Sequence, residues 1–170
     1  CFGLNKIKYA ESATTIALNL VMMKFHDRHE NLTEKLYNGE LDLPHRYVFV
    51  LTNICNLRCH FCFQDRDRRS DAMTIDNWLS VVKQLPEYAR VTLTGGEPLA
   101  FKQFEEIFHA VSDKHQCNMI TNGLLLNEQK IDLLLSKPNF KVLSISVDDI
   151  GNEIRDVKVK QWAKMLEMVK

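Results

Sequence analysis

Four short apolar runs alternate with four segments of helical periodicity from residue 46 onward. The expected strands are the runs 47–51, 90–93, 117–121 and 141–147. Each is followed by apolar residues at helical spacing, at 78–85, 101–111, 131–135 and 162–169. This alternation favours an α/β fold with a parallel sheet and right-handed crossovers. The first run is apolar throughout, which predicts a buried strand.

Several polar residues and one glycine mark the ends of expected helices. Thr74 and Asn127 are placed to cap the first and third of the helices that follow the strands. Residues 1–45 are predicted to form an N-terminal helical extension that acts as a packing arm. Within it, Asn31 to Glu34 resembles a capping box and Gly39 is a stop signal. Apolar residues at helical spacing there are Ala13, Ile16, Ala17, Leu20 and Val21.

The bulk composition is ordinary for a soluble globular protein. Of 170 residues, 45% are apolar and 26% are charged, and 22 basic residues balance 22 acidic ones. We therefore expect no nucleic-acid partner. No apolar run approaches the ~20 residues of a membrane-spanning helix, so we expect no membrane contact. The five cysteines are odd in number and three are clustered, which favours a reducing, cytoplasmic compartment.

Each expected strand is followed by an unusual motif. The first is followed by CNLRCHFC, the second by TGGEP (94–98), the third by TNG (121–123) and the fourth by SVDD (146–149). In parallel α/β sheets, functional residues collect at the carboxyl ends of the strands. The sequence therefore predicts one site built from all these motifs.

Cys55, Cys59 and Cys62 are spaced closely enough to share a metal centre. Three thiolates select zinc, copper(I) or an iron–sulfur cluster, but a closed zinc site needs four ligands. Cys117 is the only internal candidate for a fourth, and its apolar neighbours indicate a core strand. We interpret the missing ligand as an open position. A non-catalytic iron–sulfur electron carrier or redox sensor and a zinc-binding interaction module remain alternatives.

The spacing Cys55-x3-Cys59-x2-Cys62, together with Gly95-Gly96-Glu97-Pro98, resembles the radical S-adenosylmethionine (radical SAM) superfamily. The resemblance covers residues 46 to about 170 and is closest to peptide- and cofactor-maturing members of the SPASM/twitch type. It implies a [4Fe-4S] cluster on the three cysteines, with S-adenosylmethionine bound at the iron that lacks a protein ligand. Reductive cleavage would give a 5′-deoxyadenosyl radical that takes hydrogen from a peptide or small-molecule substrate. A flavodoxin or ferredoxin would supply the electron.

The resemblance also implies roles for residues in the other motifs. Gly95 and Gly96 would let backbone approach the cofactor, and Glu97 would help to meet its methionine ammonium. A branched side chain at Gly96 would then weaken cofactor binding while sparing the iron.

Other residues have weaker support as cofactor contacts, since each also has an ordinary structural explanation. Ser146 and Asp148 are interpreted as partners of the ribose or methionine end, and Arg155 as a partner of the carboxylate. The remaining candidates are Thr121 and Asn122 beside the pocket and Phe61 against adenine.

The same resemblance implies a partial (β/α) barrel of six units, of which only four are found. We therefore expect residues 46–170 to be the N-terminal part of a barrel that is truncated at its C-terminus. An open sheet edge is a site for pairing with another chain.

Overall fold

The computed structural model describes residue 28 and residues 30–64 and 73–146. The chain divides into two compact units, Cys1–Pro44 and His45–Lys170. The helices expected within residues 13–24 and 162–169 lie outside the described residues, as do Asp148 and Arg155.

In the first unit, residues 30–37 form a helix that ends at a glycine. Gly39 has a φ of 72°, and its N–H donates to Leu36 O at 3.2 Å. The Glu40 N–H donates to Lys35 O at 2.9 Å, which completes a Schellman motif. The predicted stop is confirmed. The predicted cap at Asn31 is wrong, because residue 28 is already helical and Asn31 lies inside the helix.

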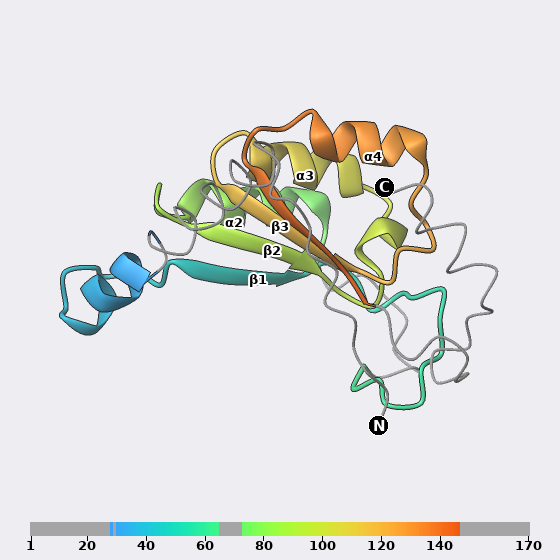
Figure 1. The fold of residues 1–170 in the computed structure, drawn as a ribbon, viewed down its shortest axis with the longest axis horizontal. Coiled ribbons are helices and arrows are strands. Elements are labelled where there is room, and N and C mark those ends of the chain that lie inside the picture. The colour runs from blue at the N-terminus through green and yellow to red at the C-terminus, as the bar shows by residue number, and fades with distance from the viewer. Residues whose placement is uncertain (1–27, 29, 65–72, 147–170) are drawn as a thin grey trace, which may run out of the picture. The chain divides into compact units, whose positions relative to one another are not determined.

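The second unit contains a parallel sheet in the order β1-β2-β3-β4 (Figure 1). Its register places Val48 beside Thr92, Thr92 beside Asn118, and Asn118 beside Val142. The strands are β1 (Arg46–Val50), β2 (Arg90–Thr94), β3 (Gln116–Thr121) and β4 (Phe140–Ile145). The predicted α/β fold with a parallel sheet is confirmed. Among the described strands, β1 and β4 are the two edges, and their pairing with another chain stays a prediction.

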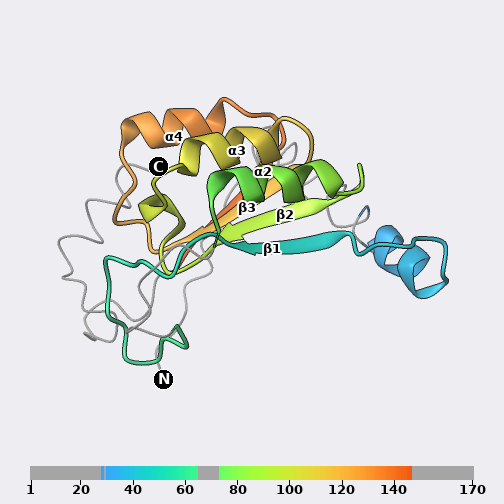
Figure 2. The ribbon, with the colours of Figure 1, turned by 180° about the vertical axis from the view of Figure 1, so that it is seen from behind.

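Three α-helices connect successive strands, and Figures 1 and 2 show them on the same face of the sheet. They are α2 (Ile75–Gln84), α3 (Phe104–Ser112) and α4 (Glu128–Leu135). Thr74 Oγ1 accepts from the Asn77 N–H at 3.4 Å, and Asn127 Oδ1 accepts from the Lys130 N–H at 2.9 Å. Both predicted caps are confirmed.

The helix expected over residues 101–111 begins three residues later than predicted, at Phe104. A short 3-10 turn, η1 (Pro98–Ala100), precedes α3, and residues 101–103 lie between them. Pro98 fixes the backbone at the start of the turn, and Glu97 caps it by accepting from the Leu99 N–H.

The hydrophobic core lies between the helices and one face of the sheet. Phe49 from β1 stacks near Trp78 of α2, with ring centroids 4.8 Å apart. Leu93, Met119 and Phe108 are fully buried in the same cluster. Burial of this apolar surface holds the strand ends in fixed positions.

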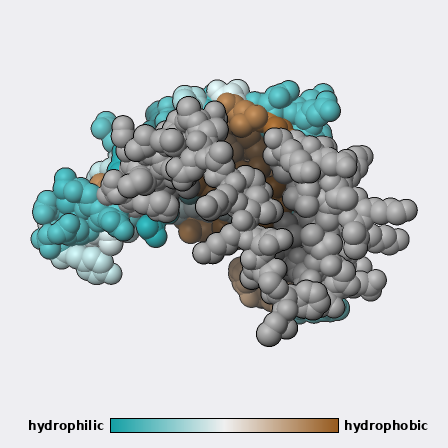
Figure 3. All heavy atoms as spheres, viewed as in Figure 1, coloured by the Kyte–Doolittle hydropathy of each residue, from teal (hydrophilic) through white to brown (hydrophobic). Residues whose placement is uncertain are grey.

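The opposite face of the sheet is not covered in the same way. Val48 is 64% exposed, Ile120 42% and Val50 38%. Apolar atoms also reach the surface over α3 and α4, at the top of the view in Figure 3. The prediction of a buried first strand is therefore wrong for one face. The described helices pack only on the side that Phe49 faces.

Within the described ranges, no helix has both the length and the apolar character needed to cross a membrane.

Candidate functional site

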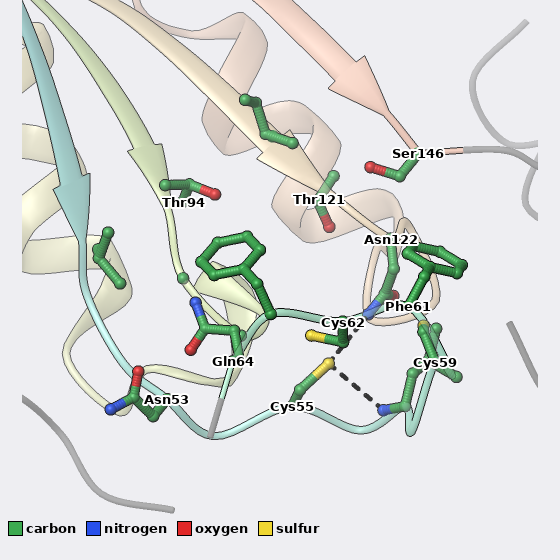
Figure 4. Close-up of a pocket in the computed structure, with 16 residues that line it drawn as sticks. Asn53, Cys55, Cys59, Phe61, Cys62, Gln64, Thr94, Thr121, Asn122 and Ser146 are labelled. Carbon is green, nitrogen blue, oxygen red and sulfur yellow. Dashed lines mark hydrogen bonds between the residues drawn. The ribbon is translucent and has the colours of Figure 1, made fainter. Parts of the chain in front are cut away.

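A pocket of about 240 Å³ lies at the carboxyl ends of the four strands. Val50 lines it from the end of β1, Thr94 from the end of β2, and Thr121 from the end of β3. Ser146, just after β4, also lines it, and Figure 4 shows these strand ends around one space. The predicted meeting of the motifs at one rim agrees with the geometry of their described residues, which for the fourth motif is Ser146 alone.

The three clustered cysteines lie on the loop that follows β1, and all of them line this pocket. Cys55 is half-buried, Cys59 is buried and Cys62 is exposed. The Cys62 N–H donates to Cys59 O at 3.2 Å, and the Leu57 N–H donates to Cys55 Sγ at 3.4 Å. The loop thus folds back on itself and brings the thiols to one region (Figure 4).

Burial raises the pKa of the Cys55 thiol. The charge of Glu97 and the neighbouring thiols raise this pKa further, while the Leu57 N–H lowers it. The thiol form is therefore favoured in metal-free protein, and metal binding must displace its proton.

Three cysteine thiols line the pocket, and their donor chemistry suits an iron–sulfur cluster. Among the described residues, no three His, Cys, Asp or Glu side chains are placed to hold one metal ion. A single zinc would need three Sγ atoms within about 3.8 Å of one another, given Zn–S bonds of about 2.3 Å. In a four-iron cluster each iron takes its own thiolate. Three thiols that line one pocket supply three of the four ligands that such a cluster takes.

Gly95 and Gly96 allow the turn after β2 to touch the backbone of the cysteine loop. A Cβ on Gly95 would lie 2.6 Å from Thr52 O, and one on Gly96 would lie 2.5 Å from Ile54 O. The Gly96 N–H donates to Thr52 O at 2.7 Å, and the Glu97 N–H donates to Ile54 O at 2.9 Å. The glycines therefore serve chain-to-chain packing as well as the pocket that they line. A side chain at Gly96 would strike the loop that leads to Cys55, so the expectation that it would spare the iron is revised.

Glu97 does not line the pocket as a free carboxylate. It is 0% exposed, and its Oε1 accepts from Thr121 Oγ1 at 2.6 Å and from the Leu99 N–H at 3.1 Å. Its Oε2 accepts from the Asn122 N–H at 2.8 Å. Burial raises the pKa of Glu97, and these hydrogen bonds and the charge of Lys130 oppose the rise. The expected contact with a ligand ammonium is thus replaced by a structural contact, since three protein donors already surround the carboxylate.

The TNG motif continues this network into the pocket. Thr121 and Asn122 both line it and both are buried. Gly123 has a φ of 79°, and its N–H donates to Thr121 Oγ1 at 3.0 Å. Asn122 Oδ1 accepts from the Leu124 N–H at 2.9 Å. The turn therefore fixes both side chains.

Most predicted site residues meet in this pocket. Apart from Glu97, every one in the described part of the chain lines it, including Phe61 and Ser146. Asp148 and Arg155 lie outside the described residues. The individual roles of these residues stay predictions.

Sequence reasoning missed several residues of the site. Asn53, Gln64 and Thr94 line the pocket, and Asn56 lies beside Cys55 and accepts from Asn122. Thr94 belongs to the TGGEP motif, so its place at a strand end was a usable signal. The others follow the cysteine loop, whose path the sequence does not determine.

Cys117 lies away from the site. It is fully buried in the core, and burial raises the pKa of its thiol to about 12. Its Cα is three residues along β3 from Ile120 at the pocket, or about 10 Å. The prediction that this cysteine is a core residue agrees with the structure, and the carrier alternative loses its internal fourth ligand.

Comparisons with known proteins point to one family. The model of the Radical SAM superfamily matches residues 49–170. The sporulation killing factor maturation protein SkfB of Bacillus subtilis is 33% identical over 121 residues, which are 68% of this chain and 29% of SkfB. A GTP 3′,8-cyclase of Clostridium perfringens is 32% identical over 127 residues, which are 69% of this chain and 38% of the cyclase.

A solved structure agrees in fold. Streptococcus suis SuiB bound to S-adenosylmethionine superimposes with a TM-score of 0.65 at 18% identity, over 83% of this chain and 36% of SuiB. The chain thus spans between 29% and 38% of the length of these three proteins. With the family model matching most of its length, the chain belongs to the radical SAM superfamily, whose enzymes use a [4Fe-4S] cluster and S-adenosylmethionine.

Proposed function

We propose that this chain forms the cofactor-binding part of a radical SAM enzyme that modifies a peptide. The proposal rests on one observation: three cysteines, two glycines and Asn122 line one pocket at the strand ends. Cys55, Cys59 and Cys62 would hold a [4Fe-4S] cluster, which leaves one iron for S-adenosylmethionine. When bound, this pair of cofactors supplies reductive cleavage to methionine and a 5′-deoxyadenosyl radical, which abstracts hydrogen from the substrate.

The glycine turn would bind the methionine end of the cofactor through carbonyl oxygens. An ammonium group needs acceptors, and the N–H groups of Gly96 and Glu97 already donate to Thr52 O and Ile54 O. The side chain of Glu97 is also occupied, so it would hold the turn in place without touching the ligand.

Two further side chains have suitable chemistry for the rest of the cofactor. Ser146 lines the pocket, and its N–H donates to Thr121 O at 2.9 Å, which fixes the residue while its hydroxyl is offered to the ribose. Phe61 is 55% exposed and lines the same pocket, so its ring could cover adenine.

A peptide substrate is favoured by the names of the relatives. SkfB is a maturation protein, and AlbA of Bacillus subtilis, 26% identical over 123 residues, is a bacteriocin biosynthesis protein. SuiB has been solved bound to the precursor peptide SuiA. The GTP cyclases make a small-molecule substrate the competing proposal. One-electron reduction would come from a partner such as flavodoxin or ferredoxin.

The test begins with the chain reconstituted anaerobically with iron and sulfide. We expect about four irons and four sulfides per chain at the three-cysteine site. Reduction and addition of S-adenosylmethionine should release 5′-deoxyadenosine slowly. Cys55→Ala should abolish that release, and Cys117→Ala is the matched control that should keep it. Stoichiometric zinc with no iron, or loaded protein that binds no S-adenosylmethionine, would contradict the proposal.

The substrate class needs a separate measurement. GTP added to the loaded protein should not raise the rate of 5′-deoxyadenosine release. A clear stimulation by GTP, with GTP consumed, would favour the small-molecule alternative.

A further inference from the structure

The geometry points to Asn122 as a positioning residue that raises the reduction potential of the cluster through Cys55. This inference rests on the proposed function, because it assumes a cluster on Cys55, Cys59 and Cys62. Asn122 and Cys55 are 67 residues apart in sequence, yet their side chains meet at the edge of the pocket (Figure 4).

The carboxamide of Asn122 is held in one orientation. Asn122 is 6% exposed, and its Oδ1 accepts from the Leu124 N–H at 2.9 Å. Because a main-chain N–H can only donate, the oxygen must face Leu124 and the amide nitrogen must face the cysteine loop. Asn122 Nδ2 donates to Asn56 Oδ1 at 2.9 Å and lies 3.8 Å from Cys55 Sγ. The two N–H groups of one buried amide therefore serve two successive residues of the loop.

The backbone of Asn122 is anchored from the neighbouring turn. Its N–H donates to Glu97 Oε2 at 2.8 Å, and Glu97 is itself fixed by Thr121 and Leu99. The amide thus projects from a rigid support formed by the ends of β2 and β3 onto a loop that follows β1.

A donor at a cysteine sulfur changes the energy of reduction. Reduction adds negative charge to an iron–sulfur cluster, and an N–H directed at a ligating sulfur stabilises that charge. Partners of metal ligands act in this way throughout metalloproteins. Cys55 also receives the Leu57 N–H at 3.4 Å, which no side-chain substitution removes. The effect of the Asn122 N–H on the reduction potential is the one that a side-chain substitution can isolate.

The experiment compares reduction potentials in anaerobically reconstituted full chain, titrated with a reductant and followed by electron paramagnetic resonance. Asn122→Asp keeps the acceptor for Leu124 but loses both N–H donors. Asn122→Leu removes the amide without adding charge. We expect the potential to shift to more negative values in both variants. Asn77→Asp is the matched control, because it makes the same change at an exposed position of α2 outside the pocket, and its potential should stay at the wild-type value.

The outcomes separate this inference from the proposed function. Wild-type protein that takes up no cluster would overturn the proposed function, and this inference with it. Wild-type and variant proteins that load equally and share one potential would overturn this inference alone. A shift in Asn77→Asp as large as that in Asn122→Asp would also overturn it, since a change remote from the sulfur would then alter the potential as much as loss of the donor. Circular dichroism identifies a variant that does not fold. If one Asn122 variant fails in this way, the reduction potential of the other one tests the inference.

Discussion

The Thr121 hydroxyl donates a 2.6 Å hydrogen bond to the Glu97 carboxylate across 24 residues of sequence. Thr121 ends β3, and Glu97 follows β2 and begins the η1 turn. The N–H of Asn122 reaches the second oxygen of the same carboxylate at 2.8 Å. One buried side chain therefore joins two turns that form the pocket, and this arrangement makes Glu97 a determinant of site geometry.

Replacement of Glu97 by Gln should destabilise the protein although the shape is kept. One oxygen would become an NH2 group that faces a donor, either the Asn122 N–H or the pair formed by Thr121 and Leu99. A buried donor left without its acceptor costs about 1–3 kcal/mol. We expect a loss of this size in the free energy of unfolding measured in urea. Glu87→Gln, at an exposed position before β2, is the control and should stay within about 0.5 kcal/mol of wild type. Equal losses in both variants would contradict the role given to Glu97.

The same carboxyl predicts a pH dependence of stability. Burial raises the pKa of Glu97 above its ordinary value of 4.5, so the folded protein holds this proton more tightly than the unfolded chain. Unfolding then releases a proton, and stability falls as the pH rises from 4.5 through the folded-state pKa. The difference in free energy of unfolding between wild type and Glu97→Gln should shrink over that range. Urea unfolding of metal-free protein at a series of pH values measures it, and a difference that grows with pH would show that the pKa is lowered.

The secondary structure was largely predictable because each strand and cap carries a local signal. Thr74 and Asn127 cap helices by bonding residues three positions away, and such contacts are encoded in the sequence itself. The exposure of Val48 was not predictable in this way, since an apolar run does not tell which face of a strand is covered. Coverage depends on where the helices pack.

The location of the site was predictable from the sequence, but the roles of its individual residues were less so. The cysteine spacing and the strand ends located the pocket, because parallel strands bring their carboxyl ends together. The long-range partners of Glu97 and Asn122 could not be predicted, since they lie 24 to 67 residues away and depend on the register of neighbouring strands. Gly96 illustrates the same limit. The sequence indicates close approach by some group, but only the structure identifies it as the carbonyl of Ile54.

Cys117 should behave as a core residue in two independent measurements. Cys117→Ala should keep the iron and sulfide content of wild type and lose about 1–2 kcal/mol of stability through the small cavity that it leaves. In metal-free folded protein, Cys117 should resist alkylation at pH 8, because its pKa is about 12 and it is fully buried. Cys62 is exposed and should react rapidly under the same conditions. Peptide mapping by mass spectrometry separates the two thiols, and loss of iron in Cys117→Ala would return this residue to the ligand set.

Gly96→Ala should impair cluster assembly and stability together. Its Cβ would lie 2.5 Å from Ile54 O and 2.9 Å from Asn53 O, and both atoms belong to the backbone of the loop that precedes Cys55. Since backbone cannot rotate away as a side chain can, the loop must shift, at a cost of about 1–3 kcal/mol. We expect a lower free energy of unfolding and reduced iron uptake in the same variant. Gly39→Ala is the matched control: its φ of 72° is strained by a side chain, but no atom lies within 4 Å of the added Cβ. It should lose about 1 kcal/mol and keep its iron. Full iron uptake by Gly96→Ala, with weaker binding of S-adenosylmethionine alone, would show that this glycine serves the cofactor and not the cysteine loop.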